Sequence, residues 1–294
     1  MKIIITGVIT LVLSSLAIAQ TTERQFFLLL QDADGDAVLD LASDEIRVMQ
    51  GPTICEITTL ETDDEGMKIA LLVDNSEVSR MSLIPLRAGL EEFLKALPPQ
   101  HEVALITVGG QARLRVDFTT DREELISAAT SLFAETSVAS VVLDALIETW
   151  SEHFQEEDNW PVFMMVSFEG PDNSGSVQDD EFNAYAGELI ARFATVNAVT
   201  ISSRGGGRGV QIFASTFLTE QTGGQYRGLS AATGLPNVLT EVATEIGNHY
   251  DHVKDRYRVG YTCTPDNPDT PIEVLLARQG LAASLFPDRK LPEE

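Results

Sequence analysis

Hydrophobic positions along the chain follow two patterns, and the change between them divides the sequence into regions. Near the N-terminus, runs such as QFFLLLQ and EIRVMQGPTICEITTLE are broken by Gly and Pro, which indicates short antiparallel strands. Over residues 63–254 apolar runs alternate with amphipathic stretches, and short strand-like runs with Pro-rich turns return afterwards. The sequence therefore predicts an α/β domain over 63–254 beside a small β module, in which strands from 20–62 pair with strands from 255–294.

The alternating region predicts a doubly wound, mostly parallel sheet flanked by helices. The runs KIALLVD, EVALITV, VFMMVSF and AVTIS are almost continuously apolar, as expected of strands covered on both faces, whereas ARLRVDF alternates like an edge strand. Apolar stripes at helical spacing are expected to face the core, and they are Val142, Leu146, Trp150 and Phe154; Phe182, Tyr185, Ala186, Leu189, Ile190 and Phe193; Phe213 and Phe217; and Val238, Val242, Ile246 and Tyr250.

The first residues have the layout of a cleavable secretory signal over 1–19. An apolar stretch from Ile3 to Leu13 follows a lysine, and small residues end at Ala19. We expect the mature chain to begin at Gln20, to be secreted or periplasmic, and to contain no membrane span. A retained N-terminal anchor is the competing interpretation.

Charge and cysteine content narrow the choice of partners. Acidic residues number 45 against 20 basic ones, a formal charge of -25, which repels nucleic acid and anionic lipid surfaces. The two cysteines, Cys55 and Cys263, are predicted to form a disulfide in an exported chain; two separate buried thiols are the alternative.

Two polar segments invite a metal interpretation. DADGD differs from a calcium-binding loop because Gly35 is fourth and Ser43 twelfth, so Asp34-Gly35 predicts a hairpin turn instead. His249 and His252 are three apart, which allows a zinc or pH-sensing cluster or, alternatively, a solvated helix face.

Several segments in order carry a resemblance to a known family. These are KIALLVDNS, FLKALPPQHEVALITVGG, DFTTDREELISAATSL, SVVLDAL, TEQTGGQYRG and RYRVGYT. Across residues 25–285 the chain resembles a von Willebrand factor A domain protein of the secreted bacterial type described from acidobacteria. The resemblance implies a binding module in which a divalent cation, usually magnesium, is held by an Asp-x-Ser-x-Ser loop, a Thr and an Asp, with one position open for a partner carboxylate.

This chain matches the family's ligand pattern only in part. The resemblance implies three remaining oxygen ligands, which are Asp74, Ser76 and Ser140. Val78 stands where another hydroxyl is expected, with Ser79 one place late, and Phe168 stands where the acidic ligand is expected. Glu169 or Asp172 would replace that ligand only after a backbone shift, which magnesium tolerates poorly.

The sequence therefore predicts an exported, non-enzymatic module with a degenerate metal-ion-dependent adhesion site and no cofactor. It is expected to bind a protein or another cell-envelope component. Candidate partner-binding residues lie in loops at the carboxyl edge of the sheet, and they are Asn75, Glu77, Thr136, Glu169, Asp172, Arg204 and Arg208. A magnesium-dependent adhesion or sensor domain is the first alternative. A hydrolase is the second, although the sequence contains no GxSxG or HExxH motif.

Overall fold

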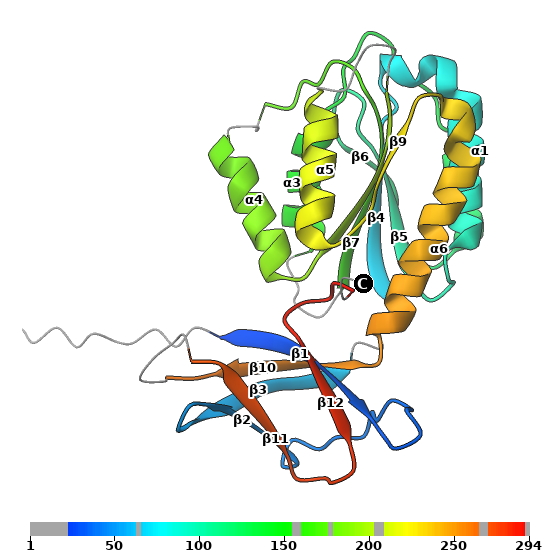
Figure 1. Ribbon diagram of the computed structural model, residues 1–294. Coiled ribbons are helices and arrows are strands. Elements are labelled where there is room, and N and C mark those ends of the chain that lie inside the picture. The colour runs from blue at the N-terminus through cyan, green and yellow to red at the C-terminus, as the bar shows by residue number, and fades with distance from the viewer. Residues whose placement is uncertain are drawn as a thin grey trace, which may run out of the picture.

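The computed structural model consists of an α/β domain and a separate antiparallel β module (Figure 1). The residues that the structure describes are 23–62, 66–154, 160–175, 179–202, 209–264 and 270–291. The predicted secretory signal, Arg204 and Arg208 lie outside these ranges.

The α/β domain is built on a sheet with the strand order β6-β5-β4-β7-β8-β9. The strands are β4 (Met67–Val73), β5 (Glu102–Thr107), β6 (Arg113–Thr119), β7 (Trp160–Phe168), β8 (Thr195–Ile201) and β9 (Tyr226–Leu229). All neighbours are parallel except β6, which pairs antiparallel with β5 at the edge. The central strands are almost completely buried, whereas β6 is largely exposed, as its alternating sequence predicts.

Helices cover both faces of this sheet (Figure 1). They are the 3-10 helix η1 (Glu77–Ser82), α1 (Leu83–Ala96), α2 (Arg122–Thr130), α3 (Val142–His153), α4 (Asp179–Ala191), α5 (Val210–Thr222), the 3-10 helix η2 (Ala232–Gly234) and α6 (Leu235–Val253). Helices α1, α2 and α6 pack on one face, and α3, α4 and α5 pack on the other. The doubly wound fold predicted from the sequence is therefore confirmed.

Two of the predicted core stripes are partly wrong. On α5, Phe213 is 66% exposed, because the side facing β8 carries the smaller residues Ala214 and Leu218, which let the helix lie close to the sheet. On α4, Ile190 is 43% exposed, and Phe193 lies beyond the end of the helix with a positive φ of 52°. The stripes on α3 and α6 do face the core, although Val238 is only half-buried.

The β module interleaves strands from both ends of the chain. Its strands are β1 (Arg24–Gln31), β2 (Ile46–Gln50), β3 (Thr53–Thr62), β10 (Arg256–Thr262), β11 (Ile272–Leu276) and β12 (Ala282–Phe286). Their order is β11-β2-β3-β10-β1-β12, and every neighbouring pair is antiparallel. Because β10 lies between β3 and β1, the module requires both ends of the chain.

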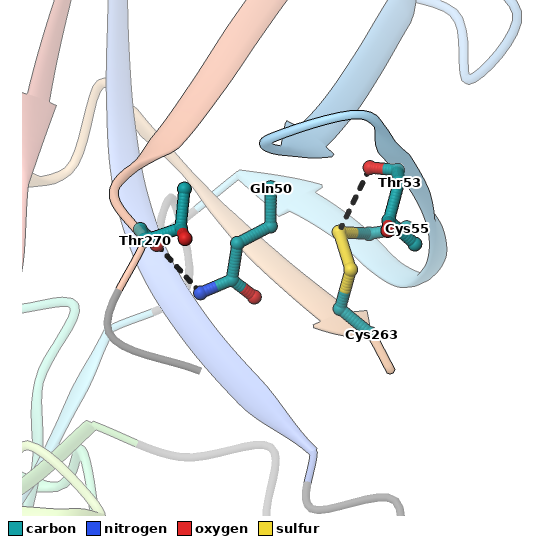
Figure 2. The surroundings of a disulfide bond; sticks show 5 residues. All are labelled: Gln50, Thr53, Cys55, Cys263 and Thr270. Atoms are coloured by element: carbon teal, nitrogen blue, oxygen red, sulfur yellow. Dashed lines mark hydrogen bonds between the residues drawn. A yellow bond between two sulfur atoms is a disulfide. The ribbon is translucent and has the colours of Figure 1, made fainter. Parts of the chain in front are cut away.

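A disulfide joins the two halves of the module (Figure 2). Cys55 in β3 bonds Cys263, which follows β10, across 208 residues of sequence, and this confirms the predicted pairing. Beside it, the Gln50 side-chain amide donates to the Thr270 carbonyl at 2.7 Å, which ties β2 to the segment before β11.

The module lies at the amino ends of the parallel strands. β3 leads towards β4, and α6 runs from the carboxyl edge of the sheet down to β10 (Figure 1). The loops at the carboxyl edge are therefore at the opposite end of the molecule. Within the described ranges no helix has the length and apolar character needed to cross a membrane.

Candidate functional site

The candidate site lies where the strand order of the α/β sheet reverses. After β4 the chain continues to β5 on one side and later returns to β7 on the other. Ligands of doubly wound sheets bind in the crevice beyond the carboxyl ends of the strands at such a reversal. Asp74 follows β4 directly, and its backbone N–H donates to Val166 of β7 at 2.8 Å, so the strand pairing itself places Asp74 in this crevice.

The Asp74 carboxylate is fully buried and held by backbone groups. Oδ1 accepts from the Ser76 N–H at 2.8 Å, and Oδ2 accepts from the Phe168 N–H at 3.3 Å. Burial raises the pKa of Asp74; hydrogen bonds from Ser76 and Phe168 oppose the rise, and the negative charge of Asp172 adds to it. The crevice therefore contains a carboxyl group whose charge is costly without a compensating positive charge.

Two hydroxyls in the crevice are buried without a partner. Neither Ser76 Oγ nor Ser140 Oγ has a hydrogen-bond partner among the described residues, and both side chains are at most 1% exposed. An unsatisfied buried hydroxyl costs about 1–3 kcal/mol. These atoms are therefore available to a ligand, a water molecule or an ion.

The other two expected ligand positions supply no oxygen. Ser79 is buried, and its hydroxyl donates to the Ser76 carbonyl at 2.8 Å, so it closes the turn of η1. Val78 packs over Gly170, where an added Cβ would lie 2.8 Å from Val78 Cγ1. The Phe168 side chain is buried in the core between the sheet and helices α1 and α6.

Asp172 lies beside Ser140 although it is distant from it in sequence. The two residues form a parallel β-bridge, and the Ser140 N–H donates to the Pro171 carbonyl at 3.2 Å. Asp172 Oδ1 accepts from the Ser174 N–H at 2.9 Å, and Oδ2 accepts from Gln211 Nε2 at 3.4 Å. A second carboxylate is thus held at the crevice by backbone pairing rather than at the position of Phe168.

Gln211 is a site residue that sequence reasoning missed. It is fully buried in the first turn of α5, and Nε2 also donates to the Gly170 carbonyl at 3.1 Å. It therefore joins α5 to the loop that follows β7. No sequence signal marks it, because a Gln in an amphipathic helix normally faces water.

The predicted partner-binding residues differ in how accessible they are. Asn75 is only 4% exposed, and its side chain joins the Phe133 carbonyl (3.1 Å) to the Gly109 N–H (2.9 Å), so its position in a partner interface stays a prediction. A Cβ at Gly109 would lie 2.7 Å from Asn75 Oδ1, so this close approach needs glycine. Thr136 is exposed.

The acidic members of the predicted set are half-buried. Glu77 accepts the Ser137 N–H at 3.1 Å and pairs with Arg80 at 3.5 Å. Glu169 and Asp172 are also half-buried, and the Glu169 N–H donates to Ile201 at 2.8 Å. These side chains remain partly accessible from the carboxyl edge.

Several elements that begin or end at the carboxyl edge of the sheet carry exposed apolar side chains, a feature that the sequence analysis did not predict. We call the set the apolar rim, and its members are Val78 (38% exposed), Met81 (92%), Ile84 (83%), Phe133 (50%) and Val210 (46%). They come from η1, the start of α1, the segment after α2 and the start of α5. The Asn75 hydrogen bond to the Phe133 carbonyl places the α2–α3 connection beside the loop after β4.

The histidine pair on α6 makes two unrelated contacts. His249 is half-buried and Nε2 contacts the Arg289 carbonyl at 2.6 Å, whereas His252 is exposed and Nδ1 contacts the Asn248 carbonyl at 2.6 Å. In the described part of the chain, no three His, Cys, Asp or Glu side chains are grouped as a metal site.

Comparisons with known proteins bear on the α/β domain. A sequence profile of the von Willebrand factor type A domain matches residues 69–164, and no curated protein matches the chain. A von Willebrand factor type A protein from Catenulispora acidiphila superposes with a TM-score of 0.53 at 10% identity, covering 91% of this chain and 72% of that one. A likeness at this identity shows a shared fold.

Two further solved structures are similar over a smaller part of the chain. The protein BatB from Bacteroides thetaiotaomicron has a TM-score of 0.48 at 11% identity, covering 62% of this chain and 100% of that one. Proximal thread matrix protein 1 of the mussel byssus, with a zinc-occupied MIDAS (metal-ion-dependent adhesion site) motif, has a TM-score of 0.47 at 14% identity. The match covers 73% of this chain and 50% of that one.

Proposed function

We propose, from the premise that this chain contains a von Willebrand factor type A domain, that it is an exported, non-enzymatic module that binds a protein or another cell-envelope component. Domains of this type commonly mediate protein interactions. The binding face is the carboxyl edge of the α/β sheet, at the end of the molecule away from the β module.

The observation that carries this proposal is the apolar rim. Large apolar side chains exposed together are unusual on a soluble surface, and they are typical of interaction sites. Met81 and Ile84 are 92% and 83% exposed on η1 and the first turn of α1, which follow the loop that carries Asp74, and Glu77 at the start of η1 adds a half-buried carboxylate. A partner with an apolar patch and neighbouring basic groups would match this combination.

The remaining donors fit a divalent cation only in part. Asp74, Ser76 and Ser140 would hold such an ion, and its chemistry would be to take a carboxylate of the partner into an open position. Val78 and Phe168 supply no oxygen at the two other positions. We therefore propose that the site is degenerate and that binding relies on the protein's own side chains.

A magnesium-dependent adhesion or sensor domain is the second candidate, and one observation favours it. The Ser76 and Ser140 hydroxyls are buried without partners among the described residues, and the neighbouring Asp172 carboxylate is a hard oxygen donor. A cation at Asp74 would satisfy both hydroxyls and offset the charge that burial makes costly.

Two observations support export. Residues 1–19 have the layout of a secretory signal, and the chain's two cysteines are joined in a disulfide, which persists in oxidising compartments. A secreted or periplasmic location would expose the carboxyl edge to envelope proteins.

Binding is tested by crosslinking the tagged chain in its native envelope and identifying the captured protein by mass spectrometry. Met81→Asp and Ile84→Asp are expected to abolish capture, because a charge in the apolar rim must be desolvated. Ile54→Asp is the matched control, since Ile54 is 65% exposed on β3 of the β module. The chain and the captured protein are then purified, and their binding is measured in EDTA and in magnesium.

Each result of this experiment has a defined meaning. Equal capture by the rim variants and wild type would contradict a binding face at the carboxyl edge. Capture that is lost in EDTA and restored by magnesium would replace the leading proposal with the second candidate.

A further inference from the structure

The crevice beyond β4 and β7 contains buried oxygen atoms that lack partners. The side chains of Ser76 and Ser140 are at most 1% exposed, and neither hydroxyl has a hydrogen-bond partner among the described residues. Within the same ranges, no salt bridge joins Asp74 or Asp172 to a basic side chain. Burial is the main cause of the raised pKa of Asp74, and the negative charge of Asp172 adds to it, so the two carboxylates lie within electrostatic range.

Backbone pairing holds these oxygen atoms together before any ligand arrives. The Glu77 N–H donates to the Val138 carbonyl at 3.2 Å, which ties the loop after β4 to the segment before Ser140. Ser140 is in turn bridged to Asp172 in the loop after β7. Because the arrangement is fixed in advance, a ligand that uses it loses little affinity to the ordering of loops.

An ammonium group fits these oxygen atoms better than a metal ion does. Magnesium requires near-octahedral oxygen ligands at about 2.1 Å, and Val78 and Phe168 supply none of them. An ammonium group carries one positive charge and three N–H donors that rotate freely, and it donates to oxygen atoms at about 2.8 Å. Two carboxylates and two unpartnered hydroxyls match such a group without an octahedral arrangement.

The neighbouring side chains favour an ammonium at the end of an apolar chain. Val78 follows Ser76 by two residues and is 38% exposed. It packs against Gly170, which precedes Asp172 by two residues. A lysine buries its four-carbon stem along apolar surface while its ammonium reaches a polar group. A guanidinium fits less well, because both oxygens of Asp74 already accept backbone N–H groups and leave no free edge for a paired contact.

We propose that the crevice binds the ammonium group of a lysine that projects from an apolar patch of the partner protein. The ammonium donates to Asp74, Ser140 and Asp172. Because Asp74 and Ser140 are 0% exposed, it enters between the loops after β4 and β7, where Val78 and Gly170 are in contact. This inference rests on the proposed function, because both place the partner at the carboxyl edge of the sheet (Figure 1).

The cation n-butylammonium, which has the atoms of a lysine side chain, tests the crevice without the partner. The disulfide-bonded chain is titrated in EDTA at neutral pH and constant ionic strength. The backbone amide signals of Ser76 and Phe168 report binding by NMR, because both N–H groups donate to Asp74. We expect saturable shifts with a Kd of about 5 mM, in the range of a ligand with so few atoms. The neutral molecule 1-butanol should produce no saturable shift.

Two variants show whether the crevice oxygens bind this probe. Asp172→Asn removes one negative charge at nearly constant size and should weaken binding about tenfold. Ser140→Ala removes a hydroxyl acceptor and should weaken binding several-fold. Asp117→Asn is the matched control, because Asp117 is an exposed carboxylate on the edge strand β6, and it should leave the affinity unchanged. Asp172 is half-buried and Ala is smaller than Ser, so both test variants are expected to fold, and their melting temperatures check this.

Two further probes distinguish the source of the cation. The cation n-butylguanidinium represents an arginine side chain. O-phosphorylethanolamine represents a lipid headgroup, whose phosphate would be repelled by the Asp172 carboxylate. Both should bind at least about tenfold more weakly than n-butylammonium. Equal or tighter binding of either one overturns the assignment to lysine.

The results also separate this inference from the proposed function. If Met81→Asp abolishes capture of the partner but the Ser76 and Phe168 signals do not shift with n-butylammonium up to about 100 mM, the lysine assignment is wrong and the binding face stands. If the probe binds but Met81→Asp captures the partner normally, the crevice chemistry stands and the proposed function is wrong. The lysine assignment is also overturned if Asp172→Asn and Ser140→Ala bind the probe as wild type does, or if magnesium shifts the same signals and excludes the probe.

Discussion

Ser140 and Asp172 are paired in a parallel β-bridge at the mouth of the crevice, and the Asn173 N–H donates to the Ser140 carbonyl at 2.8 Å. This pairing brings an acidic side chain beside a hydroxyl that the family resemblance assigned to a cation. Asp172 is four residues later in the sequence than Phe168, the position at which the resemblance implies an acidic ligand. Whether these groups hold a metal ion decides between the two functional candidates.

We expect magnesium to leave the melting temperature of the wild-type protein unchanged, because Val78 and Phe168 supply no ligand oxygen. Val78→Ser restores one hydroxyl, and at about 10 mM magnesium and a Kd of about 0.1 mM it should raise the melting temperature by roughly 5 °C relative to EDTA. Scanning fluorimetry measures both proteins.

Val78→Ala is the control for this prediction, because it removes the same apolar contact with Gly170 without adding an oxygen donor. A magnesium-dependent rise in the wild-type protein would itself contradict the degenerate site. If that rise then disappeared in Asp172→Asn, the acidic group beside Ser140 would be identified as the substitute ligand.

The contribution of Asp74 to the free energy of unfolding should fall as the pH rises. Burial raises the pKa of Asp74 above the ordinary value of 3.8, so the folded protein binds this proton more tightly than the unfolded chain does. The contribution of Asp74 is therefore most favourable at low pH and is lost as the pH rises through the raised pKa. Asp74→Asn should remove this loss. Urea unfolding in EDTA at about pH 4 and about pH 7 tests this, and an equal pH dependence in both proteins would contradict it.

The contribution of His101 to the free energy of unfolding should instead fall as the pH drops. His101 is buried, and burial together with the nearby Arg122 charge lowers its pKa from 6.5 to about 4, although Asp251 opposes the change. Because the unfolded chain then binds the proton more tightly, stability falls as the pH drops from 6.5 towards about 4. We expect a loss of about 2 kcal/mol, allowing for solvent screening of the charged form.

The variant His101→Asn tests this contribution. Asn retains an acceptor for the Met67 N–H, which His101 Nδ1 accepts at 3.1 Å, but it does not titrate. Its unfolding free energy should change less between about pH 6.5 and about pH 4.5 than that of wild type. If the two proteins lose the same stability over this interval, another group is responsible.

The spacing of apolar residues predicted most of the fold because, in the strands, the apolar positions are the ones that are buried. β4, β7 and β8 are continuous apolar runs that are buried on both faces, and β6 alternates because only one of its faces is covered. The failure at Phe213 has a physical cause. An apolar stripe predicts which face of a helix is buried only when the neighbouring surface has room for large side chains, and β8 accepts Ala214 and Leu218 instead.

The candidate site was only partly predictable from the sequence. Asp74 could be placed because it ends a long apolar run and matches the first position of the Asp-x-Ser-x-Ser loop that the family resemblance implies. The contact of Asp172 with Ser140 depends on a pairing between two irregular loops, and the role of Gln211 depends on its burial.

The disulfide should stabilise the β module more than the α/β domain. The closed loop spans 208 residues, for which chain entropy alone predicts about 5 kcal/mol of stabilisation relative to the reduced chain. Cys55 lies in β3 and Cys263 directly follows β10. Reduction should therefore increase hydrogen exchange in these two strands while the backbone amides of β7 remain protected. The variant with both Cys55→Ser and Cys263→Ser should exchange like the reduced protein and should not respond to reductant. Equal acceleration of exchange in β7 and β10 after reduction would instead mean that the β module and the α/β domain unfold as one cooperative unit.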